Sequence, residues 1–394
     1  MITPRRLVDR LPGELGLCLH GPGGGEAGTL VGRWQEEFAR AVGRTHAVAV
    51  GSGRLAMKLI LSALELPPGS EVIIPAYTLK DLLPIIRSLG LVPVPADIHP
   101  ATWNLCPETI TPRLTQRTSA ILALHLFGEP APMPEIMALA KAHGLKVIED
   151  CAHSAGSTIH GRPTGAFGDA AFFSFEAIKP INTYGGGMVV TDDARLAGEV
   201  RAAVADLAPP QLTKKMLAVR LERFLFQSGL ALIPLALLAS QRGQGVMTRL
   251  YRLIQHAPRK PWGYSPLQAH LGLGKLATLS SRIERKRQQA TLLKSLLPAS
   301  CRPQASVSGG AANHYFFVVK AGGDVAELRR RLLWHGIDAG YGPELADDCA
   351  ALLQDRHCPQ AAALASQGLH LPLHEGLDDR ALHRLARLLR QFAP

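Results

Sequence analysis

The feature that most constrains the fold is an alternation of short apolar runs with helical segments, which begins at Glu71. The apolar runs are nearly continuous, so each predicts a strand that is buried on both faces. Units of this kind form a mostly parallel sheet that helices cover on both sides. The predicted strands are EVIIP (71–75), LVPVPAD (91–97), SAILALH (119–125) and VIED (147–150).

A glycine-containing turn lies before these units, between a predicted strand at 46–50 and a predicted helix at 54–64. The first N–H groups of a helix have no acceptor within the helix, and the helix dipole is positive at that end. We therefore expect the start of this helix, at Gly53 and Arg54, to be suited to an anion such as a phosphate.

The stretch 147–193 carries the residues with the most chemistry. Its first strand ends in Asp150, and a hairpin marked by Gly and Pro follows. A second, aromatic strand at 170–175 runs into a single lysine, Lys179. If these strands are neighbours in a parallel sheet, Asp150 and Lys179 meet at its carboxyl edge, where such sheets bind ligands.

An amine and a carboxylate at this edge suit pyridoxal phosphate. This cofactor needs an amine that attaches it and a carboxylate that keeps its ring nitrogen protonated. It also needs a phosphate site and a group that packs on the ring. Residue chemistry alone also allows a solvated strand end and a structural ion pair, and it leaves both interpretations open. The candidates are Lys179 (amine), Asp150 (carboxylate), Ser174 (hydroxyl), His153 (ring contact), and Gly53 and Arg54 (helix start).

The composition describes a folded globular protein. Of the 394 residues, 47% are hydrophobic and 19% are charged, which provides for a full core. The six cysteines are dispersed without a CxxC pair, so we expect reduced thiols and no metal site. The net charge of +11 lacks the patterns of nucleic-acid-binding proteins, so nucleic acid is not a predicted partner. The N-terminus has no signal-peptide pattern, so a cytoplasmic location is expected.

The length of the chain predicts one large and one smaller domain. We expect the large domain to cover residues 1–284 and a small α+β domain to cover residues 285–394. The elements predicted around and after this boundary are a long helix from Gln268, a strand at 314–320, and helices at 324–335 and 378–391.

Residues 208–258 interrupt this pattern with an apolar and basic insertion. Its segment FLFQSGLALIPLALLA (224–239) carries no charge, but it is too short to span a bilayer and contains Pro234. One interpretation is a buried helical hairpin or a dimer contact. The other is a peripheral membrane contact through 214–256, with basic flanks on anionic headgroups. The sequence leaves both interpretations open.

A series of motifs resembles the DegT/DnrJ/EryC1/StrS sugar aminotransferase family of fold-type-I pyridoxal phosphate enzymes. The resemblance covers nearly the whole chain apart from about 208–258, and the run from IED through the hairpin to FSF and Lys179 is its most specific part. The motifs are EFARAVGRTHAVAVGSG, PPGSEVIIPAYT, HLFGEPAPM, VIEDCAHSAGS, GAFGDAAFFSFEAIKPINTYGGGMVVTDD, LQAHLGLGKL and LHLPLHEGL.

The resemblance implies a mostly parallel sheet between helices in the large domain. It also implies a homodimer and a reaction that moves an amino group, typically from glutamate, onto a keto group of a nucleotide-linked sugar. The roles that it implies are Schiff-base formation for Lys179, contact with the pyridinium nitrogen for Asp150, ring contact for His153, and phosphate contacts for Ser174 and the amides of Gly53 and Arg54.

Several positions depart from the family pattern on the substrate side. Two further hypotheses follow: a membrane-associated enzyme with a lipid-linked keto substrate, suggested by the insertion, and a non-catalytic protein that binds the cofactor, suggested by the departures. The departures are Arg54 in place of Thr, Leu79 in place of a stacking aromatic (with Tyr77 as a substitute), Gly185 in place of an acid, and Pro261-Trp262-Gly263 in place of Asn-x-Arg.

Overall fold

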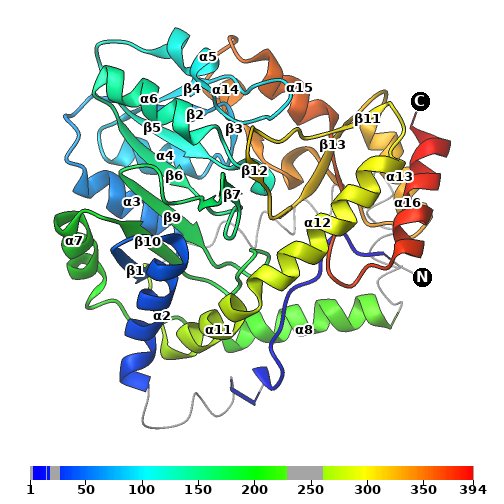
Figure 1. Cartoon of the computed structure of the whole chain (residues 1–394), viewed down its shortest axis with the longest axis horizontal. Coiled ribbons are helices and arrows are strands. Elements are labelled where there is room, and N and C mark those ends of the chain that lie inside the picture. The colour runs from blue at the N-terminus through cyan, green and yellow to red at the C-terminus, as the bar shows by residue number, and fades with distance from the viewer. Residues whose placement is uncertain (1–2, 15, 18–26, 229–260, 394) are drawn as a thin grey trace.

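The computed structural model describes residues 3–14, 16–17, 27–228 and 261–393. A seven-stranded sheet in the order β1-β10-β9-β6-β5-β2-β4 lies at its centre (Figure 1). All strands run in one direction except β10, which is antiparallel to both of its neighbours. The predicted α/β fold with a mostly parallel sheet is therefore confirmed. The strands are β1 His46–Val50, β2 Glu71–Pro75, β4 Val92–Ala96, β5 Thr118–Leu124, β6 Lys146–Asp150, β9 Ala170–Ser174 and β10 Gly187–Thr191.

Helices cover both faces of this sheet (Figure 1). Successive residues of a strand point to opposite faces, so Val48 and Val50 of β1 join one core layer while Ala47 and Ala49 join the other. This double burial explains why the strands read as continuous apolar runs. The helices on the first face are α3 Gly53–Ala63, α4 Leu82–Ser88 and α7 Ala194–Val204, and those on the second are α2 Ala27–Val42, α6 Met133–His143 and α11 Pro266–Ala277.

The C-terminal part builds a smaller antiparallel sheet, in the order β11-β13-β16-β14, around its own core. Helix α12 (Leu279–Leu296) joins the two cores, because Ile283 packs with the large sheet and Leu293 with the small one. We therefore propose that the domain boundary, predicted at 284/285, falls within α12. The other elements of this part are β11 Cys301–Pro303, β13 Phe317–Ala321, β14 Gly340–Tyr341, β16 Gly368–Leu371, α13 Val325–Trp334 and α16 Asp379–Phe392.

β3 (Tyr77–Thr78) precedes α4 and pairs with β15 (Asp347–Asp348). Two predicted elements were wrong in extent. The long helix is divided at Thr278 into α11 and α12. The strand predicted at 314–320 begins only at Phe317, since His314 has a φ of +49°, which is incompatible with a strand. The remaining elements are α5 Pro107–Ile110, α14 Cys349–Leu352, α15 Pro359–Gln367, β7 Thr158–Ile159, β8 Arg162–Pro163 and β12 Gly310–Ala311.

The described part of the insertion is mainly α8 (Thr213–Gln227), which lies along the bottom of Figure 1. Most of the uncharged segment 224–239 lies outside the described residues. Among the helices of the described ranges, none is both long and apolar enough to cross a membrane.

Candidate active site

The carboxyl ends of parallel strands bring the candidate residues to one edge of the large sheet. β6 ends at Asp150 and pairs in parallel with β9, whose Phe172 lies opposite Asp150. β9 continues to Ser174 at the same edge. β1 runs in the same direction and leads into α3, so Gly53 lies there too. The structure thus brings together the strand ends that the sequence pattern predicted to be neighbours.

Asp150 is a buried carboxylate at this edge. Burial raises its pKa to about 6, although a hydrogen bond from Ala152 and the charge of Lys179 act in the opposite direction. The N–H of Ala152 donates to Oδ1 at 2.9 Å. Within the described part of the chain, no residue donates a hydrogen bond to Oδ2. That oxygen can accept a hydrogen bond from a protonated ring nitrogen.

Lys179 follows β9 in a turn that its own N–H closes by donating to the carbonyl of Glu176 at 2.9 Å. Its side chain is half-buried. Desolvation lowers its pKa to about 8; attraction from Asp150 and Glu176 opposes this shift, and repulsion from Arg6 and Arg54 adds to it. With this pKa, about a tenth of the amine is neutral at pH 7. The lysine is therefore a usable nucleophile and base.

His153 and Tyr315 form a stacked pair beside the lysine. Their ring centroids are 4.5 Å apart with an interplanar angle of 23°, and Lys179 Nζ lies 4.8 Å from the centroid of the Tyr315 ring. Nδ1 of His153 accepts a hydrogen bond from the N–H of Phe127 at 3.3 Å. Burial, followed by the charge of Lys179, holds the pKa of His153 well below its usual range. The imidazole is therefore neutral and offers a flat surface for a ring.

Tyr315 is a site residue that sequence reasoning missed, because it was placed in a strand. Asn313 fixes the loop that carries it. The Asn313 amide donates to the carbonyls of His153 and Ala155, both at 2.9 Å, and its oxygen accepts from the N–H of Tyr315 at 2.8 Å. These contacts join the C-terminal part to the loop after Asp150. The aromatic run HYFF is the only local signal in the sequence, and it does not indicate which ring faces the site.

The start of α3, where the sequence predicts an anion site, packs closely against the strand ends. Ser52 caps the helix by accepting from the N–H of Leu55 at 3.1 Å. A Cβ on Gly53 would lie 3.0 Å from Cβ of Ser174. A Cβ on Gly187 would lie 2.7 Å from the carbonyl oxygen of Phe173 and 2.8 Å from the amide nitrogen of Gly53. Glycine at these positions therefore lets the first N–H groups of α3 approach the ends of β9 and β10.

The Arg54 side chain forms an ion pair with Asp81, so its guanidinium is engaged away from the helix start, although its charge still lowers the pKa of Lys179. Leu79 is exposed, and the aromatic surface at the site comes from Tyr315 and its neighbours. Whether Tyr77 substitutes for the missing aromatic stays a prediction.

The glycines after Tyr184 provide space. A Cβ on Gly186 would collide with the Tyr264 ring, and Gln268 donates to the carbonyl of Gly185 at 3.0 Å. The segment Pro261-Trp262-Gly263 packs against the turn that leads into α3 of the same chain. A Cβ on Gly51, in that turn, would collide with the carbonyl of Trp262. These residues shape the wall of the site and carry no acid.

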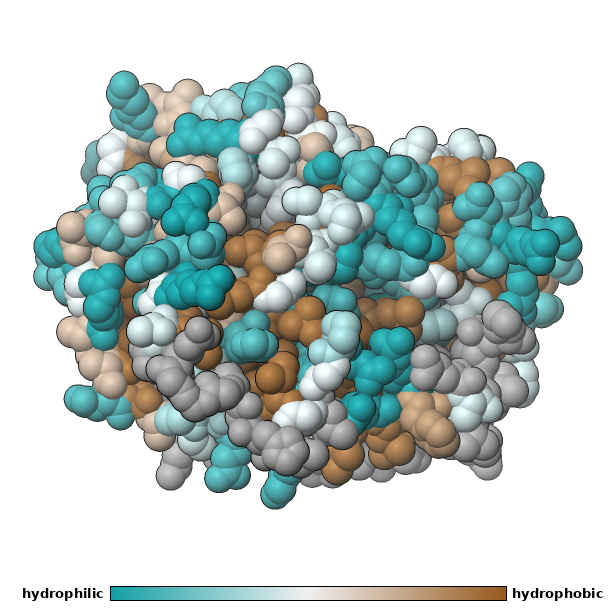
Figure 2. Space-filling model, turned by 60° about the horizontal axis from the view of Figure 1, so that its bottom comes forward, coloured by the Kyte–Doolittle hydropathy of each residue, from teal (hydrophilic) through white to brown (hydrophobic). Residues whose placement is uncertain are grey.

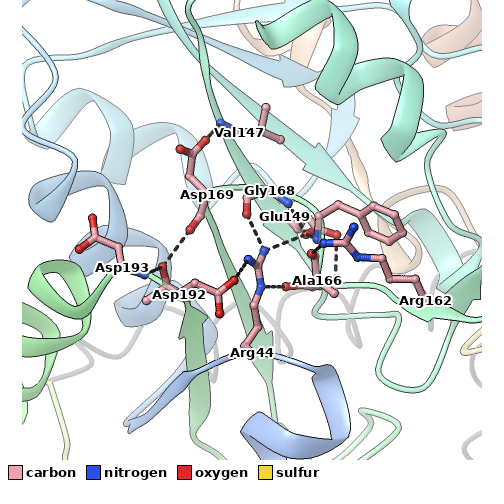
Figure 3. Close-up of polar contacts among 12 residues, drawn as sticks. Arg44, Val147, Glu149, Arg162, Ala166, Gly168, Asp169, Asp192 and Asp193 are labelled. Carbon is pink, nitrogen blue, oxygen red and sulfur yellow. Dashed lines mark hydrogen bonds and ion pairs between the residues drawn. The ribbon is translucent and has the colours of Figure 1, made fainter.

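A buried carboxylate, Glu149, lies next to Asp150 in β6, and Figure 3 shows the polar contacts around it. Glu149 Oε1 accepts from the N–H groups of Phe167 at 2.7 Å and Gly168 at 2.8 Å, and Oε2 accepts from Gly165 at 2.8 Å. Arg44 reaches within 3.8 Å of Oε1 and also donates to the carbonyl of Gly168. Because Glu149 precedes Asp150 on β6, this network fixes the strand that presents Asp150.

His125 completes this network. Its hydrogen bonds account for the arrangement of His125 and Glu149 without a metal ion. Its Nδ1 accepts from the N–H of Ala131 at 3.0 Å, so Nε2 carries the proton that lies between it and Glu149 Oε2 at 3.2 Å. Cys151 has its Sγ within 4.8 Å of these ligand atoms. His125 and Glu149 therefore form a hydrogen-bonded pair, and Cys151 lies beside it.

The sheet and the residues at its carboxyl edge define the α/β fold of the fold-type-I pyridoxal phosphate transferases. A model of the DegT/DnrJ/EryC1/StrS aminotransferase family matches residues 22–215 and 264–390. The chain belongs to this family, and the predicted membership is confirmed.

Similar proteins agree with this membership. A UDP-N-acetyl-3-dehydro-alpha-D-glucosamine 3-aminotransferase of Acidithiobacillus ferrooxidans is 44% identical over 168 residues, which are 42% of this chain and 46% of the relative. The alignment therefore spans about half the length of that relative. DesI, solved in the presence of its TDP-sugar product, is 28% identical, with a TM-score of 0.72 over 99% of this chain and 91% of its own. Helicobacter pylori PseC, an aminotransferase of pseudaminic acid biosynthesis, is 16% identical, with a TM-score of 0.78 over 100% and 99% of the two chains, and it shows the fold alone.

The residues present fit pyridoxal phosphate, the cofactor that the family implies. The carboxylate of Asp150, the partly neutral amine of Lys179 and the glycine-lined start of α3 lie along one edge of the sheet. The neutral His153 offers the flat contact for a ring. Amine, carboxylate, phosphate site and ring contact are thus all available.

Proposed function

We propose that this protein is a pyridoxal-phosphate-dependent aminotransferase that moves an amino group, with glutamate as the donor, onto a keto group of a nucleotide-linked sugar. The observation that carries the proposal is that Asp150 ends β6 and Lys179 follows the end of the neighbouring β9, and that burial moves the pKa of each toward neutrality. The substrate class is supported by the Acidithiobacillus relative, named for a UDP-sugar, and by DesI, solved with a TDP-sugar.

Each residue of the site has a defined task. Bound pyridoxal phosphate supplies an electron sink and a carrier for the amino group. Asp150, ionised above a pH of about 6, holds the ring nitrogen protonated. The neutral Nζ of Lys179 would attach the cofactor. Once released, this amine would take the proton from the Cα of the amino donor and deliver it to C4′ of the cofactor.

The other residues bind and orient. The N–H groups of Gly53 and Arg54 and the hydroxyl of Ser174 donate to the phosphate, at the positive end of the α3 dipole. His153 packs on the ring and keeps water away from one face. Its neutral state matters, because a cation on the ring face would compete with the charge that Asp150 stabilises.

The lysine variant tests this proposal directly. Lys179→Ala is expected to lose the borohydride-fixed cofactor mass on the peptide that carries residue 179, together with amino transfer from glutamate. Lys58→Ala, which removes an exposed lysine of α3, is the matched control and keeps both. If wild-type protein carries no cofactor, the proposal fails. If it binds cofactor but no amino donor changes its absorbance, the non-catalytic hypothesis replaces transfer.

A second candidate function is supported by α8. Leu217, Leu221 and Phe224 lie at spacings of four and three residues on this helix and are 64%, 58% and 60% exposed. The side of the molecule that comes forward in Figure 2 shows hydrophobic side chains at the surface among hydrophilic ones. Such a stripe fits a cytoplasmic enzyme that contacts the membrane and aminates a lipid-linked keto compound.

Flotation with anionic vesicles tests the membrane contact. The double variant Leu217→Gln/Phe224→Gln is expected to stop floating, whereas Leu352→Gln, at a similarly exposed leucine of α14, floats like wild type. Wild-type protein that stays with the soluble fraction rules out this function. We also propose the homodimer that the family resemblance implies. Sedimentation equilibrium tests it, and a monomer at all concentrations would contradict it.

A further inference from the structure

The strongest unassigned feature is a cavity of about 410 Å³ between the N-terminal segment and α8. Arg10 and Glu14 come from the N-terminal side, Arg220 and Arg223 come from α8, and Tyr184 closes the wall. Apart from Tyr184, all of these residues lie outside the ranges 22–215 and 264–390 that the family model matches. The cavity is therefore formed almost entirely by segments that the family model does not match.

The carboxylate in this cavity is already neutralised. Glu14 Oε1 accepts from Lys275 Nζ at 2.7 Å in a buried ion pair. Glu14 Oε2 accepts from the hydroxyl of Tyr184 at 3.2 Å. The nearby Asp9 pairs with Arg282 at 3.3 Å. These acids therefore have little charge left to offer the cavity arginines.

The positive charges of the three cavity arginines are not balanced by acidic side chains among the described residues. Within residues 3–14, 16–17, 27–228 and 261–393, none of Arg10, Arg220 and Arg223 forms an ion pair or donates a side-chain hydrogen bond. Nε of Arg223 is buried and has no hydrogen-bond partner. Burial, and then the charge of Arg10, lowers the pKa of Arg223, which shows that the cations crowd one another. A ligand that brings negative charge relieves this repulsion.

We propose that this cavity binds a phosphoryl group with at least two negative charges. Guanidinium forks match phosphate oxygens in bidentate geometry, and three of them exceed what a single carboxylate can satisfy. The volume exceeds that of a lone phosphate and falls in the range of small-molecule sites. Leu11 and Met216 in the lining leave room for an apolar or sugar-like attachment. The site goes beyond the proposed amino transfer and does not depend on it.

Two sources can supply the same phosphoryl chemistry. One is a soluble phosphorylated molecule. The other is the headgroup of an anionic lipid, because Leu217 and Phe224 are exposed on the same helix that places Arg220 and Arg223 in the cavity. Figure 1 shows the N-terminal trace passing beside α8, so both walls belong to one side of the molecule.

Titration calorimetry of the full-length holoprotein with inorganic pyrophosphate tests the site. The variant Arg220→Gln/Arg223→Gln is expected to bind at least about tenfold more weakly than wild type, since each guanidinium donates charge-assisted bonds. The variant Lys214→Gln/Arg87→Gln removes the same charge from exposed positions on α8 and α4 and binds like wild type. The absorbance of the bound cofactor shows whether each variant is folded. If Arg220→Gln/Arg223→Gln does not fold, Arg10→Gln replaces it as the cavity variant.

Vesicles of equal parts phosphatidylcholine and phosphatidic acid form the second arm, with phosphatidylcholine alone as the blank. Binding of pyrophosphate that the cavity variants weaken assigns the site to a soluble ligand. Binding of vesicles alone, weakened in the same way, assigns it to a lipid headgroup. If wild type binds neither probe, or if the cavity variants bind as tightly as wild type, the proposal is overturned. If the protein binds a phosphoryl probe as expected but does not transfer amino groups, only the proposed function fails.

Discussion

Gly187 gives the sharpest test of how the cofactor site is built. It opens β10, and its backbone faces both the end of β9 and the start of α3. A methyl group added there would lie 2.7 Å from the carbonyl oxygen of Phe173 and 2.8 Å from the amide nitrogen of Gly53. Both neighbours are backbone atoms, so no side chain can rotate away. The variant Gly187→Ala must therefore move α3 away from the strand ends.

The expected cost follows from the kind of contact. Overpacking of a close-packed site costs about 1–3 kcal/mol, so the melting temperature of the apoprotein should fall by a few degrees. The moved atom, the amide nitrogen of Gly53, is one of the N–H donors that we propose for the phosphate. Losing about 1.4 kcal/mol of that contact weakens cofactor binding roughly tenfold. Thermal unfolding of the apoprotein and titration with pyridoxal phosphate measure the two effects separately.

Gly198 in α7 is the matched control, because a Cβ there meets nothing within 4 Å. Alanine favours a helix over glycine by roughly 0.5–1 kcal/mol, so Gly198→Ala should raise the melting temperature slightly and leave cofactor binding unchanged. The two variants thus make the same chemical change with opposite signs. If Gly187→Ala melts and binds cofactor like wild type, the close approach of α3 to β10 is not a constraint, and the reasoning is refuted.

Three further predictions follow from the site. Glu149→Gln keeps the shape but places an amide where a carboxylate accepts three backbone N–H bonds, so unfolding should become easier by about 3 kcal/mol, checked by thermal melting; an unchanged melt contradicts it. Tyr315→Ala should weaken cofactor binding about tenfold by removing the ring beside His153, while Tyr315→Phe keeps it; equal losses would point to the hydroxyl. Because burial lowers the pKa of Lys179 to about 8, the neutral amine grows as pH rises. Covalent uptake of cofactor by apoprotein should therefore speed up about tenfold from pH 7 to 9 and then level off, whereas a rise continuing to pH 10.5 would indicate an unshifted lysine.

The large sheet, and the proximity of Asp150 and Lys179 at its carboxyl edge, could be predicted from the sequence because their causes are local. Continuous apolar runs indicate doubly covered strands, and parallel strands place their carboxyl ends at one edge. Asp150 ends one strand and Lys179 follows the end of the adjoining strand, so their proximity follows once the strands are assigned. The same rule applied to β1 predicts the start of α3 at this edge, where Gly53 lies; the anion site there stays a prediction.

Tyr315 could not be predicted, because its position depends on contacts between distant parts of the chain. It reaches the site through the Asn313 bonds to the loop after Asp150. A positive φ at His314 then turns the chain out of the predicted strand. Apolar periodicity indicates neither effect, since both HYFF in a strand and HYFF in a turn satisfy it. The division of α11 from α12 at Thr278 was missed for a similar reason, since no Gly or Pro marks it.

The insertion is more closely joined to the catalytic residues than its sequence suggests. Lys215 of α8 forms an ion pair with Glu176, and the charge of Glu176 raises the pKa of Lys179 against desolvation. Tyr184, in the loop after the same lysine, forms a wall of the arginine-lined cavity. Anything that displaces α8 therefore changes the electrostatic partner of Glu176, and through it the fraction of neutral Lys179. A phosphoryl ligand on Arg220 and Arg223 would hold α8 in place. The segment outside the family pattern thus has a physical route to the chemistry that the family pattern provides.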